Sequence, residues 1–227
     1  MSDERVRYEL RDDVALLHWD DGKANVVSPA AQADLNAALD RAEKEAKAVV
    51  ISGRAGRFSA GFDLGIMNAG DARAIAAMVR GGGELGLRLF SFPLPTVAAV
   101  HGHALAMGAV LLMAIDERIA ADVPAKVGLN ETAIGMTLPG FALILARERL
   151  APTHLVRAAA NAELYSPADA VEAGFIDQVV PADELLGVAL ARARTLAQLN
   201  TRAHHATKLA LRGPVIEALR ASLQQVE

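Results

Sequence analysis

The chain has 227 residues, of which 52% are hydrophobic and 22% are charged, and its net charge is −4 at pH 7. This length can bury a substantial core in one domain, and the composition is typical of a compact soluble protein. No cluster of Lys or Arg is dense enough to indicate nucleic acid or an anionic membrane as a partner. Because the chain has no cysteine, disulfides, a thiolate nucleophile and cysteine-ligated metals are excluded.

Neither the first residues nor the apolar runs of the sequence indicate export or membrane insertion. Residues 1–5 are charged and lead into no apolar segment, so we expect no secretory signal. The apolar runs at residues 97–100 and 109–115 are too short to span a bilayer. We therefore expect a soluble, cytoplasmic protein.

Short strands alternate with amphipathic helices in the first half of the chain. Residues 14–19 and 49–52 are predicted strands, and Ser28-Pro29 is a typical helix start between them. Asp71 is the expected cap of the next helix. The run Gly81-Gly82-Gly83 lies inside that helix, and because glycine costs up to ~1 kcal/mol relative to alanine, we expect a bend or break there.

The second half continues the alternation. A strand is predicted at 95–100, followed by a segment at 108–115 that is apolar on every side and therefore buried if helical. Ser166-Pro167 is a second predicted helix start, and a strand is predicted at 176–180. The pattern favours an α/β fold in one domain, with a core at residues 1–185 and a helical C-terminal region at 186–227.

Two turns offer backbone N–H groups to a developing negative charge. The small residues of Ser59-Ala60-Gly61-Phe62-Asp63 follow a predicted loop, and Gly102 to Gly108 join a strand to a helix N-terminus. Free N–H donors at such positions bind oxyanions. Taken alone, each segment is also compatible with an ordinary turn.

The order of these motifs resembles the crotonase superfamily, the enoyl-CoA hydratases and isomerases. The resemblance is carried by Phe58-Ser59-Ala60-Gly61-x-Asp63-Leu64, then Val97 to Ala104, then Glu131 with Ile134-Gly135-Met136 and Pro139-Gly140. Residues 165–170 and 173–181 extend the match over nearly the whole chain. The stretch Gly128-Leu129-Asn130-Glu131-Thr132 is similar to the Δ3,Δ2-enoyl-CoA isomerases in particular.

The resemblance implies a spiral of β-β-α units, with a C-terminal helical region used for trimer or hexamer assembly. It implies an acyl-CoA thioester as substrate, with coenzyme A as part of that substrate and no separate cofactor. We expect no metal site, because no His, Asp or Glu cluster in the sequence has ligand spacing. The thioester oxygen would lie between the N–H groups of Phe62 and Met107, although the family usually has glycine at the position of Met107. The expected pocket is formed by Ala60, Gly61, Asp63, Gly108, Val110 and Pro139.

The acidic positions indicate the type of reaction. Family hydratases hold water between two glutamates, which correspond here to Glu131 and Val110, and valine cannot activate water. A single carboxylate can still move a proton from one carbon to another, so we predict double-bond isomerisation, with the pKa of Glu131 raised by burial. A hydratase, another enolate-forming enzyme (hydrolase or decarboxylase) and a non-catalytic acyl-CoA-binding protein remain alternatives.

The remaining polar residues receive weaker assignments. Asp63 is expected to anchor its turn, and Asp116 is expected to be structural because it faces away from Val110 on a helix. Lys23, Arg54 and Lys208 are candidates to bind the phosphates of CoA, although an exposed cation at such positions is also ordinary.

Overall fold

A computed structural model describes residues 5–226 of the chain. Its strands are β1 (Val6–Arg11), β2 (Val14–Trp19), β3 (Ala48–Ser52), β4 (Gly56–Ser59), β5 (Thr96–Val100), β6 (Gly102–Leu105), β7 (Glu117–Ala121), β8 (Val127–Gly128) and β9 (Gln178–Val180). Its helices are α1 (Pro29–Glu45), α2 (Leu64–Asn68), α3 (Ala72–Phe90), α4 (Met107–Ala114), the 3-10 helix η1 (Thr132–Ile134), α5 (Gly140–Arg149), α6 (Pro152–Ala159), α7 (Asp169–Ala173), α8 (Leu185–Leu196) and α9 (Thr201–Leu223).

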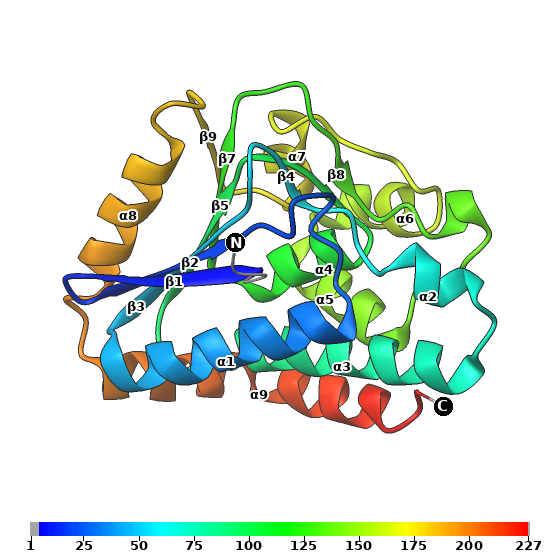
Figure 1. The fold of residues 1–227 in the computed structure, drawn as a ribbon, viewed down its shortest axis with the longest axis horizontal. Coiled ribbons are helices and arrows are strands. Elements are labelled where there is room, and N and C mark those ends of the chain that lie inside the picture. Colours follow the sequence, from blue (N-terminus) through cyan, green and yellow to red (C-terminus); the bar gives the residue numbers. More distant parts are fainter. Residues whose placement is uncertain (1–4, 227) are drawn as a thin grey trace.

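The strands form two sheets, and the chain alternates between them. One sheet has the order β1-β2-β3-β5-β7-β9, and the other has the order β4-β6-β8. Among the strands of residues 5–226, β1 pairs antiparallel with β2, and the other strand pairings within the two sheets are parallel. Each of β3, β5 and β7 in the large sheet is followed by one strand of the small sheet and then by helix, which gives the expected spiral of β-β-α units (Figure 1).

Both faces of the large sheet are covered, as expected for parallel strands. On one face Val50, Val97 and Ala99 pack with Leu185 and Ala189 of α8. Alternate residues of the same strands enter the main core with α1, α3, α4 and α5. Figure 1 shows α8 on one side of this sheet and α1 and α3 on the other. Helix α9 packs against α3 and α5.

Local signals in the sequence placed several element boundaries correctly. Ser28 Oγ accepts the N–H of Ala31 at the start of α1, and Asp71 accepts those of Arg73 and Ala74 at the start of α3. All residues of α4 are buried. The prediction for Ser166-Pro167 was wrong by two residues: residues 167–168 form a turn and α7 begins at Asp169.

The expected bend or break at Gly81–Gly83 was also wrong, since α3 runs unbroken from Ala72 to Phe90. These glycines serve packing. A side chain at Gly81 would meet Gln32, one at Gly82 would meet Phe62, and one at Gly83 would meet Leu223. The contacts that these neighbours make with α3 offset the low helix propensity of glycine.

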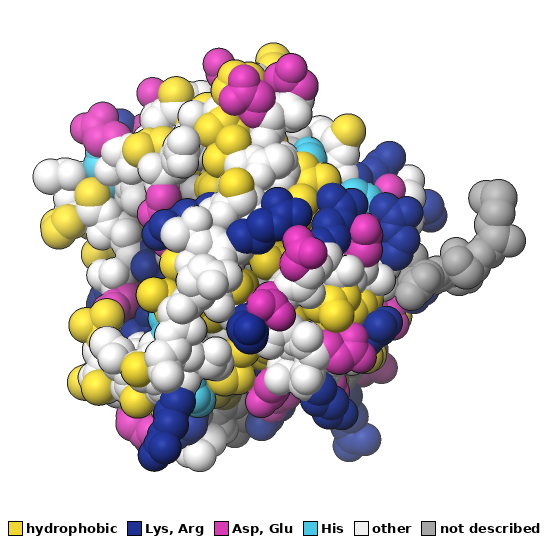
Figure 2. Space-filling view, turned by 90° about the vertical axis from the view of Figure 1, so that its left-hand side faces the viewer, with side chains coloured by type: hydrophobic (Ala, Val, Ile, Leu, Met, Phe, Trp, Pro, Cys, Tyr) yellow, Lys and Arg dark blue, Asp and Glu magenta, His cyan; other side chains and the backbone are white. Residues whose placement is uncertain are grey.

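Charged side chains of both signs are interspersed over the face of the molecule seen in Figure 2. This face therefore offers no broad basic area of the kind that nucleic acids bind. Among the residues from 5 to 226, no helix is both long and apolar enough to cross a membrane.

Candidate active site

Three parallel strands of the small sheet end at one edge, and a candidate site residue follows each. Ser59 of β4 pairs with Ala104 of β6, and Leu105 of β6 pairs with Gly128 of β8. Phe62 lies three residues beyond the end of β4, Met107 two beyond β6, and Glu131 three beyond β8. Because the carboxyl ends of parallel strands share an edge, the topology gathers the three residues that the sequence had singled out.

The loop after β4 is held by hydrogen bonds on both sides of Gly61. Ser59 Oγ donates to the carbonyl of Asn25 over 2.6 Å and accepts the N–H of Gly61, and the Gly61 carbonyl accepts the N–H of Val27 over 2.8 Å. Gly61 has φ +94°, a conformation that suits glycine. In residues 5–226, no hydrogen bond occupies the N–H of Phe62, which keeps it a candidate donor.

The second donor lies at the N-terminus of α4. Ala106 has φ 49° and ψ −125°, a strained backbone conformation of the kind that clusters at functional sites. Its N–H donates to the carbonyl of Gly128 over 3.0 Å, which fixes the turn to β8. Met107 follows as the first residue of α4, so its N–H has no partner inside the helix.

The two turns are in close contact. A Cβ placed on Gly61 would lie 3.2 Å from the nitrogen of Met107, and one placed on Gly108 would lie 2.6 Å from the carbonyl oxygen of Ser59. The pocket residues Gly61 and Gly108 are therefore glycines because a side chain at either would separate the loops. The two candidate donors, the N–H groups of Phe62 and Met107, are held on neighbouring backbone segments.

The side chain of Met107 is directed into the core. It is 1% exposed, and its methyl carbon would lie 3.4 Å from a Cβ on Gly82 of α3. The thioether therefore packs against α3 at Gly82, where no Cβ is present. The departure from the glycine usual at this position leaves the backbone N–H in place.

Glu131 is a buried acid with one oxygen unsatisfied. Glu131 lies two residues after the fully buried Leu129 and is itself 7% exposed. Its Oε2 has no hydrogen-bond partner within residues 5–226. Burial raises the pKa of Glu131 above its ordinary value, and a hydrogen bond to its own backbone opposes this in part. The direction of the shift is the one predicted from the apolar sequence around it, and it suits a group that must accept and return a proton.

The position that corresponds to the second glutamate of family hydratases is Val110, an apolar residue that is buried in the structure. Val110 lies in the first turns of α4 and is 1% exposed, and its N–H donates to Ala106 within the helix. It offers no atom that could hold or activate water. Within residues 5–226 no group of three or more His, Asp or Glu side chains is arranged to hold a metal ion.

The other predicted pocket residues frame the same loops. The N–H of Ala60 donates to the carbonyl of Ala24 over 3.0 Å. Asp63 caps α2 by accepting the N–H of Gly65, which is the anchoring role expected from the sequence. Pro139 precedes α5 as its N-cap, eight residues beyond Glu131 along the chain.

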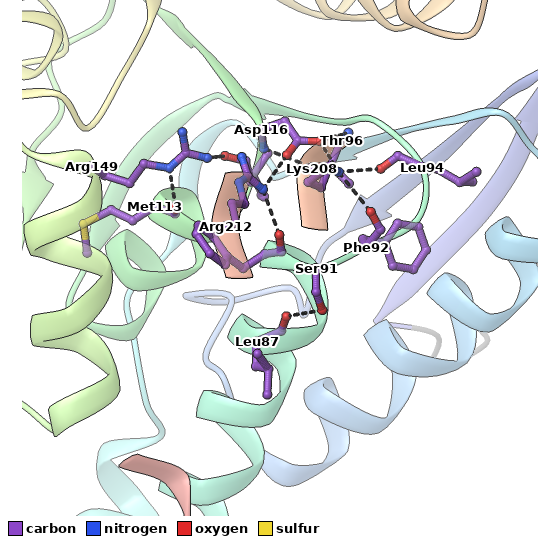
Figure 3. A network of polar contacts seen from close by, with 12 residues as sticks. Leu87, Ser91, Phe92, Leu94, Thr96, Met113, Asp116, Arg149, Lys208 and Arg212 are labelled. Carbon is purple, nitrogen blue, oxygen red and sulfur yellow. Dashed lines mark hydrogen bonds and ion pairs between the residues drawn. The ribbon is translucent and has the colours of Figure 1, made fainter. Parts of the chain in front are cut away.

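The three candidate CoA-binding cations do not lie together. Arg54 donates to the carbonyl of Lys23 over 2.6 Å and pairs with Asp20. Lys23 is followed by Ala24, whose carbonyl accepts the N–H of Ala60 in the loop that carries the Phe62 donor. Lys208 lies in a different place. Its Nζ contacts the carbonyls of Phe92 and Leu94 and the carboxylate of Asp116, so no N–H is left for a phosphate (Figure 3).

Two features of the site were not predicted from the sequence. Asn130, beside Glu131, has a buried Oδ1 without a partner in residues 5–226, and the motif that named Glu131 could have drawn attention to it. Ala106 adopts its strained conformation although alanine carries no local signal for a positive φ. Only the packing of β6, β8 and α4 requires it.

Comparisons with known proteins agree with this fold. Residues 9–226 match the protein family described as enoyl-CoA hydratase/isomerase. An enoyl-CoA hydratase/isomerase family protein from Pseudomonas syringae has a solved structure with a TM-score of 0.95 and 42% identity, covering 97% of this chain and 96% of that one. The chain belongs to the enoyl-CoA hydratase/isomerase family, and its fold is that of the crotonases.

Relatives within the family carry both activities in their names. The human mitochondrial enoyl-CoA delta isomerase 1 is 30% identical over 88% of this chain and 67% of its own length. A probable enoyl-CoA hydratase of Bacillus subtilis is 38% identical over 57% of this chain and 50% of its own length. This chain thus matches only about half of that hydratase. The choice between the two reactions rests on the site.

Proposed function

We propose that this protein is an enoyl-CoA isomerase in which Glu131 alone moves the proton. The observation that supports this proposal most directly is that Glu131 is buried with an unsatisfied Oε2, while Val110 occupies the position of the second acid of family hydratases. Two further observations support the proposal: β4, β6 and β8 are parallel neighbours that end at one edge, and within residues 5–226 the N–H groups of Phe62 and Met107 that follow two of them have no hydrogen-bond acceptor.

The reaction needs a base, an anion site and the same base again as an acid. The Glu131 carboxylate removes a proton from C2 of a 3-enoyl-CoA, and the electron pair of that C–H bond delocalises into the thioester carbonyl. The dienolate oxygen accepts hydrogen bonds from the N–H groups of Phe62 and Met107; one such donor is typically worth about 10²- to 10³-fold in rate. Protonated Glu131 then returns the proton to C4, and the double bond lies between C2 and C3.

Hydration is disfavoured for a physical reason. Addition of water to a 2-enoyl-CoA needs a water molecule positioned and deprotonated beside the substrate. Val110 removes the second acceptor that would hold this water, and its own methyl groups occupy that side of α4. A hydratase function that uses another acid, and acyl-CoA binding without turnover, are the alternatives that the experiment below separates.

Lys23 and Arg54 are proposed to contact the phosphates of CoA. They lie together beside the loop that carries the Phe62 donor. Arg54 already pairs with Asp20 on the surface, so a phosphate would compete with that carboxylate. Lys208 is withdrawn from this role because its ammonium group is fully engaged.

Assembly into trimers or hexamers remains a prediction for this chain. Exposed leucines on the outer side of the C-terminal region, among them Leu199 and Leu211, support it. Leu211 is 76% exposed, and such apolar side chains are typical of surfaces that become buried between subunits. The mass in solution, measured by light scattering after gel filtration, tests this expectation.

The decisive experiment offers a 3-enoyl-CoA and a 2-enoyl-CoA separately to the wild type and to Glu131→Gln. The proposal expects conjugated product from the first substrate only, and its loss in the variant. Glu84→Gln, which changes an exposed glutamate of α3, is the matched control and should retain full activity. Hydration of the 2-enoyl-CoA supports the hydratase alternative, and binding without turnover supports the third.

A further inference from the structure

Gly82 of α3 is the one glycine of the run Gly81–Gly83 that contacts both candidate donor residues. A Cβ on Gly82 would lie 2.6 Å from Cε1 and 2.8 Å from Cζ of the Phe62 ring. It would also lie 3.4 Å from the methyl carbon of Met107. The neighbouring glycines contact Gln32, Phe141 and Leu223 instead.

We propose that Gly82 is a positioning residue for the oxyanion site, acting through the side chains of Phe62 and Met107; this inference rests on the proposed function. The Phe62 ring lies against the bare backbone of α3, and the Met107 thioether is buried beside it. Each of these side chains belongs to a residue whose N–H is a candidate donor. The helix surface therefore sets where both side chains lie.

A methyl group at this position cannot be absorbed without movement. Contacts of 2.6 Å and 2.8 Å between carbon atoms are far inside the usual 3.5–4.0 Å. Since α3 is fixed by Gln32 on one side and by Leu223 and Phe141 on the other, the Phe62 ring is the part that must shift. Phe62 directly follows Gly61 in a loop, and the inference is that the displaced ring carries its own peptide N–H with it rather than only turning about its side-chain torsions.

The glycine also accounts for the methionine in this chain. Met107 is bulkier than the glycine usual at its position, and the missing Cβ at Gly82 gives its methyl group space. Gly82 and Met107 are therefore a complementary pair. An alanine Cβ at 82 would meet the Met107 methyl carbon at 3.4 Å, an ordinary van der Waals contact, so only a side chain larger than alanine would displace the thioether.

The test compares two glycine-to-alanine changes in the same helix. Gly82→Ala introduces the overlap, whereas a Cβ on Gly86 would meet only Leu145 Cδ1 at 4.0 Å, an ordinary contact. Both changes raise the helix propensity equally. For isomerisation of a 3-enoyl-CoA, we expect kcat to fall about 10- to 100-fold in Gly82→Ala, with a much smaller change in KM, and to stay unchanged in Gly86→Ala.

Rescue separates positioning from mere packing. Phe62→Leu removes the ring carbons that Gly82→Ala would meet but keeps the backbone N–H, so the double variant should recover most of the lost kcat. If Gly82→Ala does not fold, Phe62→Ala tests the same link, because the loop then loses its hold on α3 and kcat should fall. A kcat for Gly82→Ala, or for Phe62→Ala in its place, within twofold of Gly86→Ala overturns the inference.

A failure of the proposed function is distinguishable from a failure of this inference. If the wild type turns over neither enoyl-CoA, the function fails, and Gly82 is then judged by calorimetric binding of the saturated butanoyl-CoA. The donors would still bind its carbonyl, so Gly82→Ala should bind at least about threefold more weakly than Gly86→Ala. Equal affinities of the two variants would overturn the role of Gly82.

Discussion

The Nζ atom of Lys208 lies 2.6 Å from Oδ2 of Asp116, and this ion pair is 5% and 13% exposed. Arg212 Nη1 reaches Oδ1 of the same carboxylate over 2.8 Å. The N–H of Thr96 donates to Oδ2, the oxygen that Lys208 also contacts (Figure 3). The carboxylate thus joins α9 to the starts of β5 and β7. Burial alone would raise the pKa of Asp116, but the two cations outweigh it and hold the pKa below its ordinary value.

Breaking this pair should destabilise the fold without touching catalysis. For Lys208→Met we expect a loss of about 3–5 kcal/mol in the free energy of unfolding, because Asp116 keeps its charge with one partner fewer. The exposed pair of Lys47 with Asp13 is the control, and Lys47→Met should cost less than about 1 kcal/mol. Urea unfolding measures both. A substantially smaller kcat per folded molecule in Lys208→Met would instead implicate Lys208 in the reaction.

Acid should weaken the same pair. Since the pKa of Asp116 is lower in the folded state than in the unfolded chain, its contribution to stability is complete above the unfolded value, about 3.9. The contribution is lost as the pH falls from there through the folded value. We expect Asp116→Asn to flatten the acid limb of the stability curve. An unchanged slope below about pH 4 in the variant contradicts this assignment.

The rate of isomerisation should fall on the acid side at a higher pH than for an ordinary glutamate. Burial raises the pKa of Glu131, and only its deprotonated form can act as the base. The acid limb of kcat/KM should therefore have its midpoint above about 4.3, the usual value for glutamate. A pH–rate profile from about pH 4 to 8 measures it. A midpoint at or below the ordinary value would remove Glu131 from the role of a desolvated base.

Removing the charge of Glu131 should stabilise the protein while abolishing its activity. A buried carboxyl with a raised pKa favours folding when protonated and loses that contribution as the pH rises through the folded value. Glu131→Gln keeps the shape without the charge, so its melting temperature should exceed that of the wild type near pH 7. The difference should shrink toward about pH 4, below which the wild-type carboxyl is protonated in both states. A lower melting temperature for the variant at neutral pH would contradict the prediction.

Restoring an acid at position 110 should shift the reaction toward hydration at a cost in stability. Val110→Glu places a second carboxyl group in the buried first turns of α4, which should cost at least about 2 kcal/mol. The variant should gain detectable hydration of a 2-enoyl-CoA, and the like charge should raise the pKa of Glu131 further. Val110→Gln is the control for size and polarity. Equal rates of hydration by the Glu and Gln variants would show that the absence of a carboxylate at position 110 does not explain why the wild type fails to hydrate a 2-enoyl-CoA.

The sequence predicted the parts of this protein that depend on short-range chemistry. The caps at Ser28 and Asp71 and the fully buried α4 depend on residues within a few positions, and the structure confirms them. The raised pKa of Glu131 followed from its apolar neighbours in the chain. Family resemblance added the spiral and the candidate donors, which propensity and periodicity alone do not specify.

Tertiary structure decided whatever depends on contacts between distant segments. The sequence suggested Lys208 as a phosphate ligand, whereas in the fold Lys208 pairs with Asp116. The run Gly81–Gly83 looked like a break until Phe62 and Leu223 packed against it. Propensity is a property of one segment, whereas the free energy that overrides it comes from neighbours far along the chain. The sequence by itself therefore determined which chemical groups are present and the local shape around them, and only the folded packing decided which of those groups meet.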